Sequence, residues 1–110
     1  MKTIQLPADA VVYNQDNPYR QTNGENVNSE VAYLGYTLPK NVSPEDFDPA
    51  RHATIQHFLN PETGEEILVT RPYQSRSFVP AIGQLVNVGW KYVEYNDGSK
   101  HLQYFCEACL

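Results

Sequence analysis

The sequence has few of the features that mark secreted, membrane-spanning or metal-binding proteins. Its two cysteines both lie near the C-terminal end, so it lacks the disulfide framework on which small secreted domains depend. No apolar stretch approaches the length of a transmembrane helix, and the first fifteen residues contain no continuous apolar segment of the secretory type. We therefore expect a cytoplasmic protein that does not associate with membranes.

Basic residues are also scarce. The chain has 8 lysines and arginines against 13 acidic residues, which gives a formal net charge of -5. Nonspecific nucleic-acid binding requires a basic surface, so we do not expect it here. Most of the acidic residues precede residue 67, which predicts an uneven distribution of charge over the surface.

Motifs for catalysis are missing as well. The sequence has no glycine-rich phosphate loop, and no nucleophile signature surrounds Ser75 or Ser77. The carboxylate pairs at 45–46 and 65–66 are explained by the solvated ends of a helix and a hairpin. The sequence therefore predicts no catalytic residues and favours a binding protein over an enzyme.

The cysteines and histidines raise the question of a metal site. Cys106 and Cys109 have the spacing of half a zinc site, and His52 and His57 could supply the other half. However, positions 52 and 57 point to opposite faces in a strand and lie about 140° apart in a helix. We therefore predict no metal and no cofactor, with Cys106 packed in the core and Cys109 free in a frayed tail at 106–110. His57 is expected at the edge of the core with a hydrogen-bond partner.

What the sequence does contain is enough apolar and aromatic material for one domain over residues 1–110. Hydrophobic residues make up 41% of the chain, and there are 8 tyrosines. Ser43 and Pro44 are typical of a helix start and predict one short helix near 43–49. β-Branched and alternating stretches lie at 3–13, 31–39, 53–59, 66–71 and 84–88, and in a hairpin at 90–95 and 99–105. From these seven stretches we expect about six short strands. The expected fold class is mainly β, with β-rich α+β as the alternative, arranged as a small antiparallel barrel or sandwich.

Residues 48–59 have two possible structures. The turn sequence "NPETGE" (60–65) lies between two strand-like stretches, which favours a hairpin. In the alternative, Asp48 caps a helix that runs to the stop at Asn60.

The C-terminal hairpin allows a register to be predicted. The turn Asn96-Asp97-Gly98 fits a type I turn with a glycine bulge. If Glu94 faces Lys100, four large side chains share one face, and we expect that face to be buried. These side chains are Trp90, Tyr92, Leu102 and Tyr104.

Two loops combine tyrosine with arginine, the residue types that contribute most to binding energy at interfaces. One is the long polar loop at 14–30, and the other spans 71–78. Arginine also suits an anionic group, which it can hold through two parallel hydrogen bonds. The candidate binding residues are Tyr19, Arg20, Arg71, Tyr73 and Arg76.

From these observations we expect a non-enzymatic binding or regulatory protein that engages a macromolecular partner, most simply another protein, through the two loops. Small acidic β proteins of this kind occur among the accessory proteins of bacteria and their viruses, which is an analogy. The alternative is a protein that binds an anionic or nucleotide-like small molecule, or a small hydrolase or transferase. The candidate side chains would converge on one cavity in the second case. A structural role is a third possibility, in which Tyr73 and Phe78 close the end of the barrel.

Overall fold

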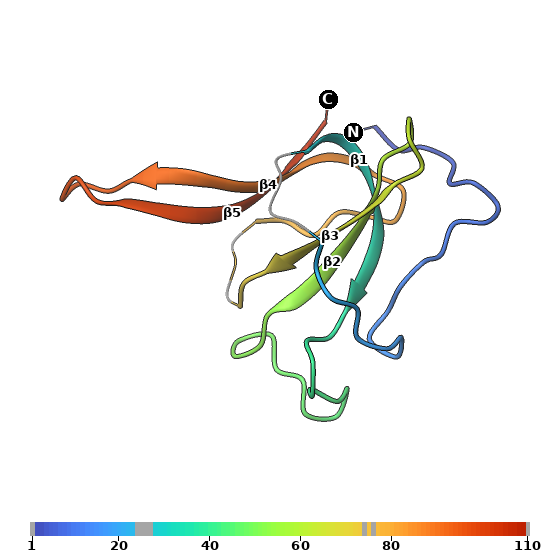
Figure 1. Cartoon of the computed structure of the whole chain (residues 1–110), viewed down its shortest axis with the longest axis horizontal. Helices are drawn as coiled ribbons and strands as arrows, with labels where there is room; N and C mark the ends of the chain where they lie inside the picture. The colour runs from blue at the N-terminus through green and yellow to red at the C-terminus, as the bar shows by residue number, and fades with distance from the viewer. Residues whose placement is uncertain (1, 24–27, 74, 76, 110) are drawn as a thin grey trace.

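The computed structural model describes residues 2–23, 28–73, 75 and 77–109, and over these residues it forms one five-stranded antiparallel sheet (Figure 1). The order of the strands across the sheet is β3-β2-β1-β4-β5. The mainly β prediction is therefore confirmed. The strands are β1 (Asn28–Thr37), β2 (Thr54–Leu59), β3 (Glu66–Arg71), β4 (Leu85–Glu94) and β5 (Lys100–Ala108).

Residues 54–71 form a hairpin, as the turn chemistry at 60–65 indicated. Phe58 pairs with Ile67 across β2 and β3, and the register is regular along the whole hairpin. In the turn, the Asn60 side chain accepts the Glu62 N–H at 2.9 Å, and Gly64 takes a positive φ of 75°. The alternative of a helix from Asp48 is therefore wrong.

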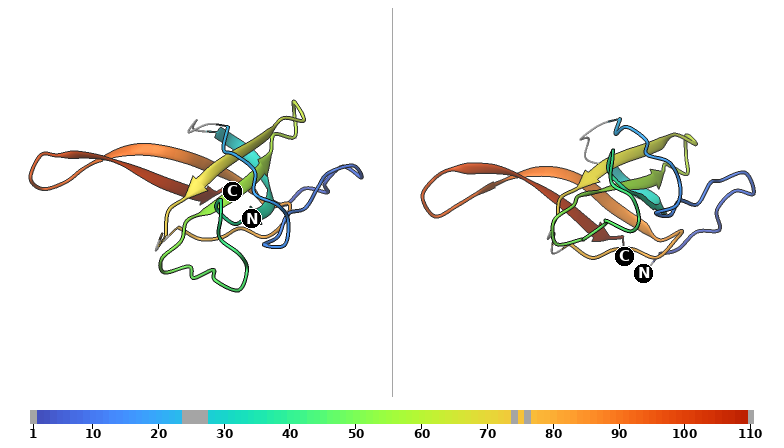
Figure 2. Two further views of the ribbon diagram at one scale, coloured as in Figure 1. Left: turned by 60° about the horizontal axis from the view of Figure 1, so that its bottom comes forward. Right: turned by 90° about the horizontal axis from the view of Figure 1, so that it is seen from below.

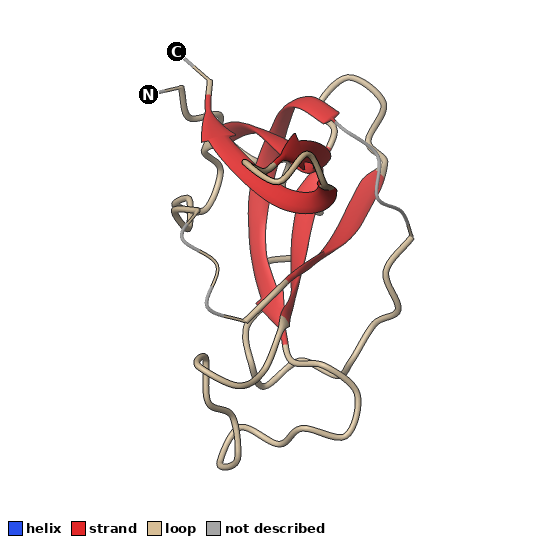
Figure 3. Ribbon diagram, turned by 90° about the vertical axis from the view of Figure 1, so that its left-hand side faces the viewer, coloured by secondary structure: helices blue, strands red, loops and turns tan. Residues whose placement is uncertain are grey.

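The described residues contain no helix, so the prediction of a short helix at 43–49 is wrong (Figure 3). Ser43 does bond to Asp46, at 3.0 Å, but the chain makes only isolated turns here. Pro49 explains this, because a proline disfavours helical geometry at the residue before it. Asp48 instead begins a second turn, in which its carbonyl oxygen accepts the N–H groups of Arg51 and His52 at 2.9 Å.

Two further strand predictions need correction. The stretches 84–88 and 90–95 belong to one continuous strand, because Gly89 keeps its place in the ladder opposite Phe105. The stretch 3–13 is not a strand, and its described ladder contacts are single bridges from Thr3 and Tyr13. Pro7 interrupts it and opens a tight turn, in which its carbonyl oxygen accepts the Ala10 N–H at 3.0 Å.

The sheet curls around a concave core. Side chains from both edge strands, β3 and β5, belong to one buried cluster, although three strands separate them in the sheet. This packing requires the two edges to bend toward the same side. We call this side the concave face, and its buried side chains are Val31, Tyr33, Phe58, Ile67, Val69, Val86, Val88, Tyr104 and Cys106.

The opposite, convex face is covered by the N-terminal segment, residues 2–23. Leu6 and Tyr13 of this segment pack against Leu34 and Leu59 of the sheet. Ile4 packs beside them, against Ala32. The stretch 3–13, which was predicted to be a strand, therefore runs across one face of the sheet.

β4 and β5 extend beyond the rest of the sheet as a projecting hairpin (Figures 1 and 2). In the described ladders β4 pairs with β1 as far as Val88, and beyond Val88 it pairs with β5 alone. We call residues 89–105 the arm. The predicted register is confirmed, because Glu94 lies opposite Lys100. The predicted burial is wrong toward the tip, where Tyr92 is 73% exposed and Leu102 41% exposed.

The C-terminal tail is not frayed at Cys109, contrary to prediction. Cys109 is buried beside Ala32 and Leu85, and its N–H donates to the Leu85 carbonyl at 3.0 Å. Cys106 is buried in the concave core, as predicted, and this burial raises the pKa of its thiol to about 11. Along the described chain, no helix is long and apolar enough to cross a membrane.

Candidate functional site

The N-terminal segment is held against the convex face at a bulge in β1. Leu34 is the extra residue, because Tyr33 pairs with Phe58 while Gly35 pairs with the next residue, His57. The Tyr13 N–H donates to the Leu34 carbonyl at 2.7 Å. A Cβ on Gly35 would lie 2.0 Å from the Tyr13 carbonyl oxygen, and the φ of this glycine is +107°. The close approach of the two backbones therefore requires glycine at position 35.

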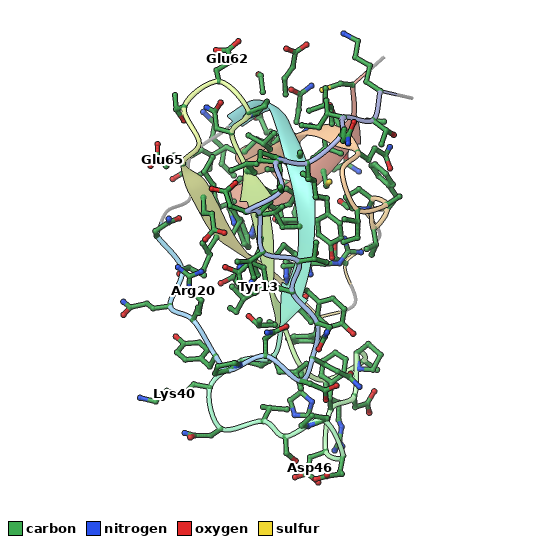
Figure 4. The ribbon with its side chains drawn as sticks, turned by 90° about the vertical axis from the view of Figure 1, so that its right-hand side faces the viewer. Tyr13, Arg20, Lys40, Asp46, Glu62 and Glu65 are labelled. Carbon is green, nitrogen blue, oxygen red and sulfur yellow. The ribbon has the colours of Figure 1, made fainter. Side chains whose placement is uncertain are left out.

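A polar cluster joins the N-terminal segment to β3 on the convex face. The Tyr13 hydroxyl donates to the Glu66 carboxylate, with oxygen distances of 3.1 and 3.2 Å. Arg20 donates to the same hydroxyl and forms an ion pair with Glu66 at 2.9 Å. Figure 4 shows Tyr13 and Arg20 close together. Burial raises the pKa of Tyr13, and the Glu66 charge raises it further, so the hydroxyl remains a donor.

His57 lies below this cluster and is fully buried. Its ring stacks on Tyr13 with centroids 3.9 Å apart, and its Nε2 lies 2.9 Å from the Thr37 hydroxyl. Its Nδ1 has no hydrogen-bond partner among the described residues. Burial lowers the pKa of His57 to about 4, and the Arg20 charge lowers it further, so the ring is neutral near pH 7. The predicted hydrogen bond is present, but the residue lies deeper than the core edge.

The cluster shows no sign of a metal centre. In the part of the chain that the structure describes, no three histidine, cysteine, aspartate or glutamate side chains lie together as ligands would. The charges of Arg20 and Glu66 compensate one another instead. The convex cluster is therefore built to attach the N-terminal segment.

The concave face contains a cavity of about 570 Å³. The strands contribute Tyr33, Tyr36, Thr54, Gln56 and Arg71 to its wall. The other described lining residues are Phe47, Pro49, Ala50, Pro72, Ser75 and Val79. Its described lining contains no histidine or carboxylate that could serve as a base for Ser75, so it offers binding groups and no activated nucleophile. Its apolar wall consists of Tyr33, Tyr36, Phe47, Pro49, Pro72 and Val79.

Two polar side chains of the concave face have buried groups without a partner. Tyr33 is 3% exposed, and its hydroxyl finds no acceptor or donor among the described residues. The indole N–H of Trp90, at the base of the arm, is also buried and also has no hydrogen-bond partner among the described residues. Burial raises the pKa of Tyr33 well above its usual value. Such groups are costly to bury, because they lose their hydrogen bonds to water and gain none in the fold.

Arg71 borders the same cavity from the end of β3. Its guanidinium donates to the carbonyl oxygens of Ser75, Ser77 and Phe78, so it fixes the course of the loop that follows. It also lies over the Tyr104 ring, 5.7 Å from the ring centroid. Among the described residues it has no carboxylate partner, in contrast to Arg20.

The structure describes four of the five predicted binding residues and places them at separate points. Arg20 belongs to the convex cluster, whereas Arg71 borders the cavity on the concave face. Tyr19 lines a second hollow of about 530 Å³, between the segments 15–19 and 38–44. Tyr73 is 58% exposed and lies outside the cavity lining, and Arg76 is outside the described residues.

Sequence reasoning missed the residues that build the cavity and the arm surface. Tyr33 was assigned to a strand without a function, and Phe47 to a helix that does not form. The exposure of Tyr92 was also missed, although it lies close to the "NDG" turn, where a hairpin tip is free of neighbours. Tyr92 lies only four residues before the turn at Asn96, and this short distance along the strand could have indicated its exposure.

Comparisons with known proteins add no assignment. No family model, curated protein or solved structure matches the chain.

Proposed function

We propose that this chain is a non-enzymatic binding protein that engages another protein through its loops and its arm. The observation that carries the proposal is the set of large apolar side chains exposed on the arm. Tyr92 and Leu102 lie opposite one another on the arm and are 73% and 41% exposed. They lie on the same face of the hairpin as Tyr104, which is buried nearer the rest of the sheet. A cross-strand tyrosine–leucine pair left in water favours a partner that covers it.

The loop at 71–78 extends the same surface. Arg71 lies over the ring of Tyr104, and Leu102 is two residues from Tyr104 on the same strand face. Beyond Arg71, the side chains of Tyr73 and Val79 are 58% and 57% exposed. The loop and the arm therefore offer neighbouring apolar groups to one partner, with tyrosine as the main contact residue.

The predicted loop at 14–30 offers a second contact in its described part, residues 14–23, because the chain from Asn28 onward belongs to β1 and residues 24–27 lie outside the described residues. Tyr19 is 43% exposed and lines the second hollow, and we propose that it contacts the same partner at a second point. Arg20 already has its charge compensated by Glu66. Tyr19 is therefore the better candidate for a contact in this loop.

The test is capture of the partner from an extract, followed by measurement of its affinity for variants. Tyr92→Ser combined with Leu102→Ser should weaken binding by more than about 2 kcal/mol, as the loss of a central contact does. The matched control is Val11→Ser with Val12→Ser, because both valines are 49% exposed in the N-terminal segment. Equal binding by both double variants would show that the arm is not the interface.

A further pair of variants separates the loops. Tyr73→Ala should weaken the same interaction, and Tyr19→Ala should do so only if the 14–30 loop takes part. Arg71→Ala is a poor choice for this purpose, because its three carbonyl contacts hold the loop in place. The contacts of Arg71 therefore give it a structural role in addition to the predicted role in binding.

A further inference from the structure

The N-terminal segment is anchored to the sheet near both of its ends. The Ile4 N–H donates to the Gly83 carbonyl oxygen at 2.9 Å. At the other end, the Asn23 side chain accepts the Leu68 N–H of β3 at 2.9 Å. Residues 7–20, which we call the middle part of the segment, can therefore leave the convex face while both ends stay attached.

Tyr13 holds this middle part in place (Figure 4). Among the described backbone N–H groups of the middle part, that of Tyr13 alone bonds to the sheet, at 2.7 Å from the Leu34 carbonyl oxygen. Its ring stacks on His57, with centroids 3.9 Å apart and an angle of 21° between the planes. Its hydroxyl bonds to Arg20 and Glu66. The docked position thus depends on one side chain, and that side chain lies directly on a histidine.

His57 lies where a positive charge is unfavourable. The ring is fully buried, its Nε2 faces the neutral Thr37 hydroxyl of β1, and its Nδ1 has no partner among the described residues. A proton on Nδ1 would therefore be buried without an acceptor. The stacked Tyr13 ring attracts a cation less strongly than the water that the cation would lose.

Two charged groups act on the ring from the elements packed against it. Arg20 of the N-terminal segment disfavours a second positive charge, whereas Glu66 of β3 favours it. Burial is the largest effect, and together with Arg20 it lowers the pKa of His57 to about 4. While Tyr13 covers the ring, His57 is therefore neutral over most of the acid range.

We propose that protonation of His57 releases the middle part of the N-terminal segment from the convex face, while both ends of the segment and the sheet remain in place. A ring without exposed surface takes up a proton from water once Tyr13 has moved away, and water then stabilises the charge. The concave core contains only apolar, tyrosine and cysteine side chains, so none of its groups gains a positive charge in acid. This device does not rest on the proposed protein partner.

The direction of the effect follows from the proton affinity of His57 in the two states. Its pKa is about 4 while Tyr13 covers the ring, and about 6.5 once the ring reaches water. The released state therefore binds more protons between these values, and a fall in pH favours release. From pH 7 to pH 4.5, the equilibrium constant for release should rise about 50-fold.

Amide hydrogen exchange of the whole chain tests this, with the rates corrected for the intrinsic effect of pH. The Tyr13 N–H reports on release, and the Tyr33 N–H, which donates to the Gln84 carbonyl oxygen at 3.1 Å, reports on opening of the sheet. At pH 7, the protection factor of Tyr13 should be at least about tenfold below that of Tyr33. It should fall about 50-fold further at pH 4.5.

Two outcomes of this measurement would overturn the proposal. Equal protection of the two amides at pH 7 would mean that the segment leaves only when the sheet unfolds. A protection factor of Tyr13 that does not change with pH would mean that His57 does not control release.

His57→Gln removes the titrating group and keeps a polar side chain. In this variant the protection factor of Tyr13 should change less than about threefold between the two pH values. The matched control is His101→Gln, because His101 is exposed on the arm, and it should keep the 50-fold change. A change of that size that survives His57→Gln, or that disappears in His101→Gln, would assign the switch to other groups and overturn the role of His57.

Titration of the His57 ring by NMR in the wild-type chain needs no variant and therefore does not depend on the folding of His57→Gln. The midpoint should lie at least about one pH unit below 6.5, since the docked segment keeps the ring neutral. A midpoint near 6.5 would show that Tyr13 does not cover the ring in solution, and the proposal would be wrong.

Discussion

The two faces of the sheet differ in how each satisfies the hydroxyl of a buried tyrosine. On the convex face, the hydroxyl of Tyr13 has partners on both sides, Arg20 and Glu66, and the charges of those two compensate each other. On the concave face, the hydroxyl of Tyr33 and the charge of Arg71 lack such partners among the described residues. The difference distinguishes a buried hydroxyl that holds two segments together from one that contributes no hydrogen bond to the fold.

The largest expected effect concerns Gly35, which allows the N-terminal segment to reach the convex face. Gly35→Ala places a Cβ 2.0 Å from the Tyr13 carbonyl oxygen at a positive φ. We expect it to lower the free energy of unfolding by more than about 3 kcal/mol, because both the strain and the clash must be relieved. Denaturant titration measures the loss.

Gly64→Ala is the matched control for this change. Gly64 also has a positive φ, of +75°, but a Cβ there would meet nothing within 4 Å. Its cost should be about 1 kcal/mol, from backbone strain alone. Equal losses in the two variants would show that the contact with Tyr13 contributes nothing.

The next effect in size is a pH dependence from His57. Its pKa is about 4 in the folded chain and about 6.5 when unfolded, so the unfolded state binds more protons between these values. The free energy of unfolding should therefore fall as the pH is lowered from 6.5 toward 4, by up to about 3 kcal/mol. Denaturant titrations at several pH values measure the slope.

His57→Gln should flatten this slope, because glutamine does not titrate. His101→Gln should leave it unchanged, since His101 is exposed on the arm. A slope that survives His57→Gln would assign the dependence to the carboxylates.

A smaller effect comes from removing one hydroxyl on each face. Tyr13→Phe should lower the free energy of unfolding by about 1 kcal/mol, because the hydroxyl bonds to Arg20 and Glu66. Tyr33→Phe should change it by less than about 0.5 kcal/mol or raise it slightly. Thermal unfolding of the two variants, measured side by side, compares the faces directly. A larger loss for Tyr33→Phe than for Tyr13→Phe would contradict the difference between the two hydroxyls.

The smallest effect is expected on the arm, which lies beyond both faces of the body. Tyr92→Ala should lower the free energy of unfolding by less than about 0.5 kcal/mol, since Tyr92 is 73% exposed. Denaturant titration suffices to check this value. A loss above 1 kcal/mol would mean that the arm packs against the chain in solution.

The sequence was sufficient to predict most of the strands because their signals are local. The turn at 60–65 and the "NDG" turn each specify a hairpin, and the Glu94–Lys100 register followed from alternation alone. The burial of Tyr92 was predicted wrongly, because burial depends on how far β1 extends beside β4. That length is a property of the assembled sheet.

The cavity could not be predicted for a similar reason. Tyr33, Phe47 and Arg71 come from three distant parts of the chain, and the curl of the sheet brings them to one wall. Arg71 was identified as a binding residue by its type, but its loop contacts were not foreseeable. Cys109 was assigned to a loose end, because nothing in the sequence shows that Lys2 and Leu85 bond to it.

The meeting of residues 2, 85 and 109 has a consequence for the rate of folding. The Lys2 N–H donates to the Cys109 carbonyl at 3.4 Å, and the Lys2 carbonyl accepts the Leu85 N–H at 2.8 Å. These contacts close a loop of almost the whole chain, whereas the β2–β3 and β4–β5 hairpins close within a few residues. The hairpins should therefore form early, and the N-terminal segment should dock last, after the sheet has presented Gly35 to it. Because the last step joins residues that are distant in the sequence, we expect the chain to fold slowly for a small domain, in milliseconds to seconds.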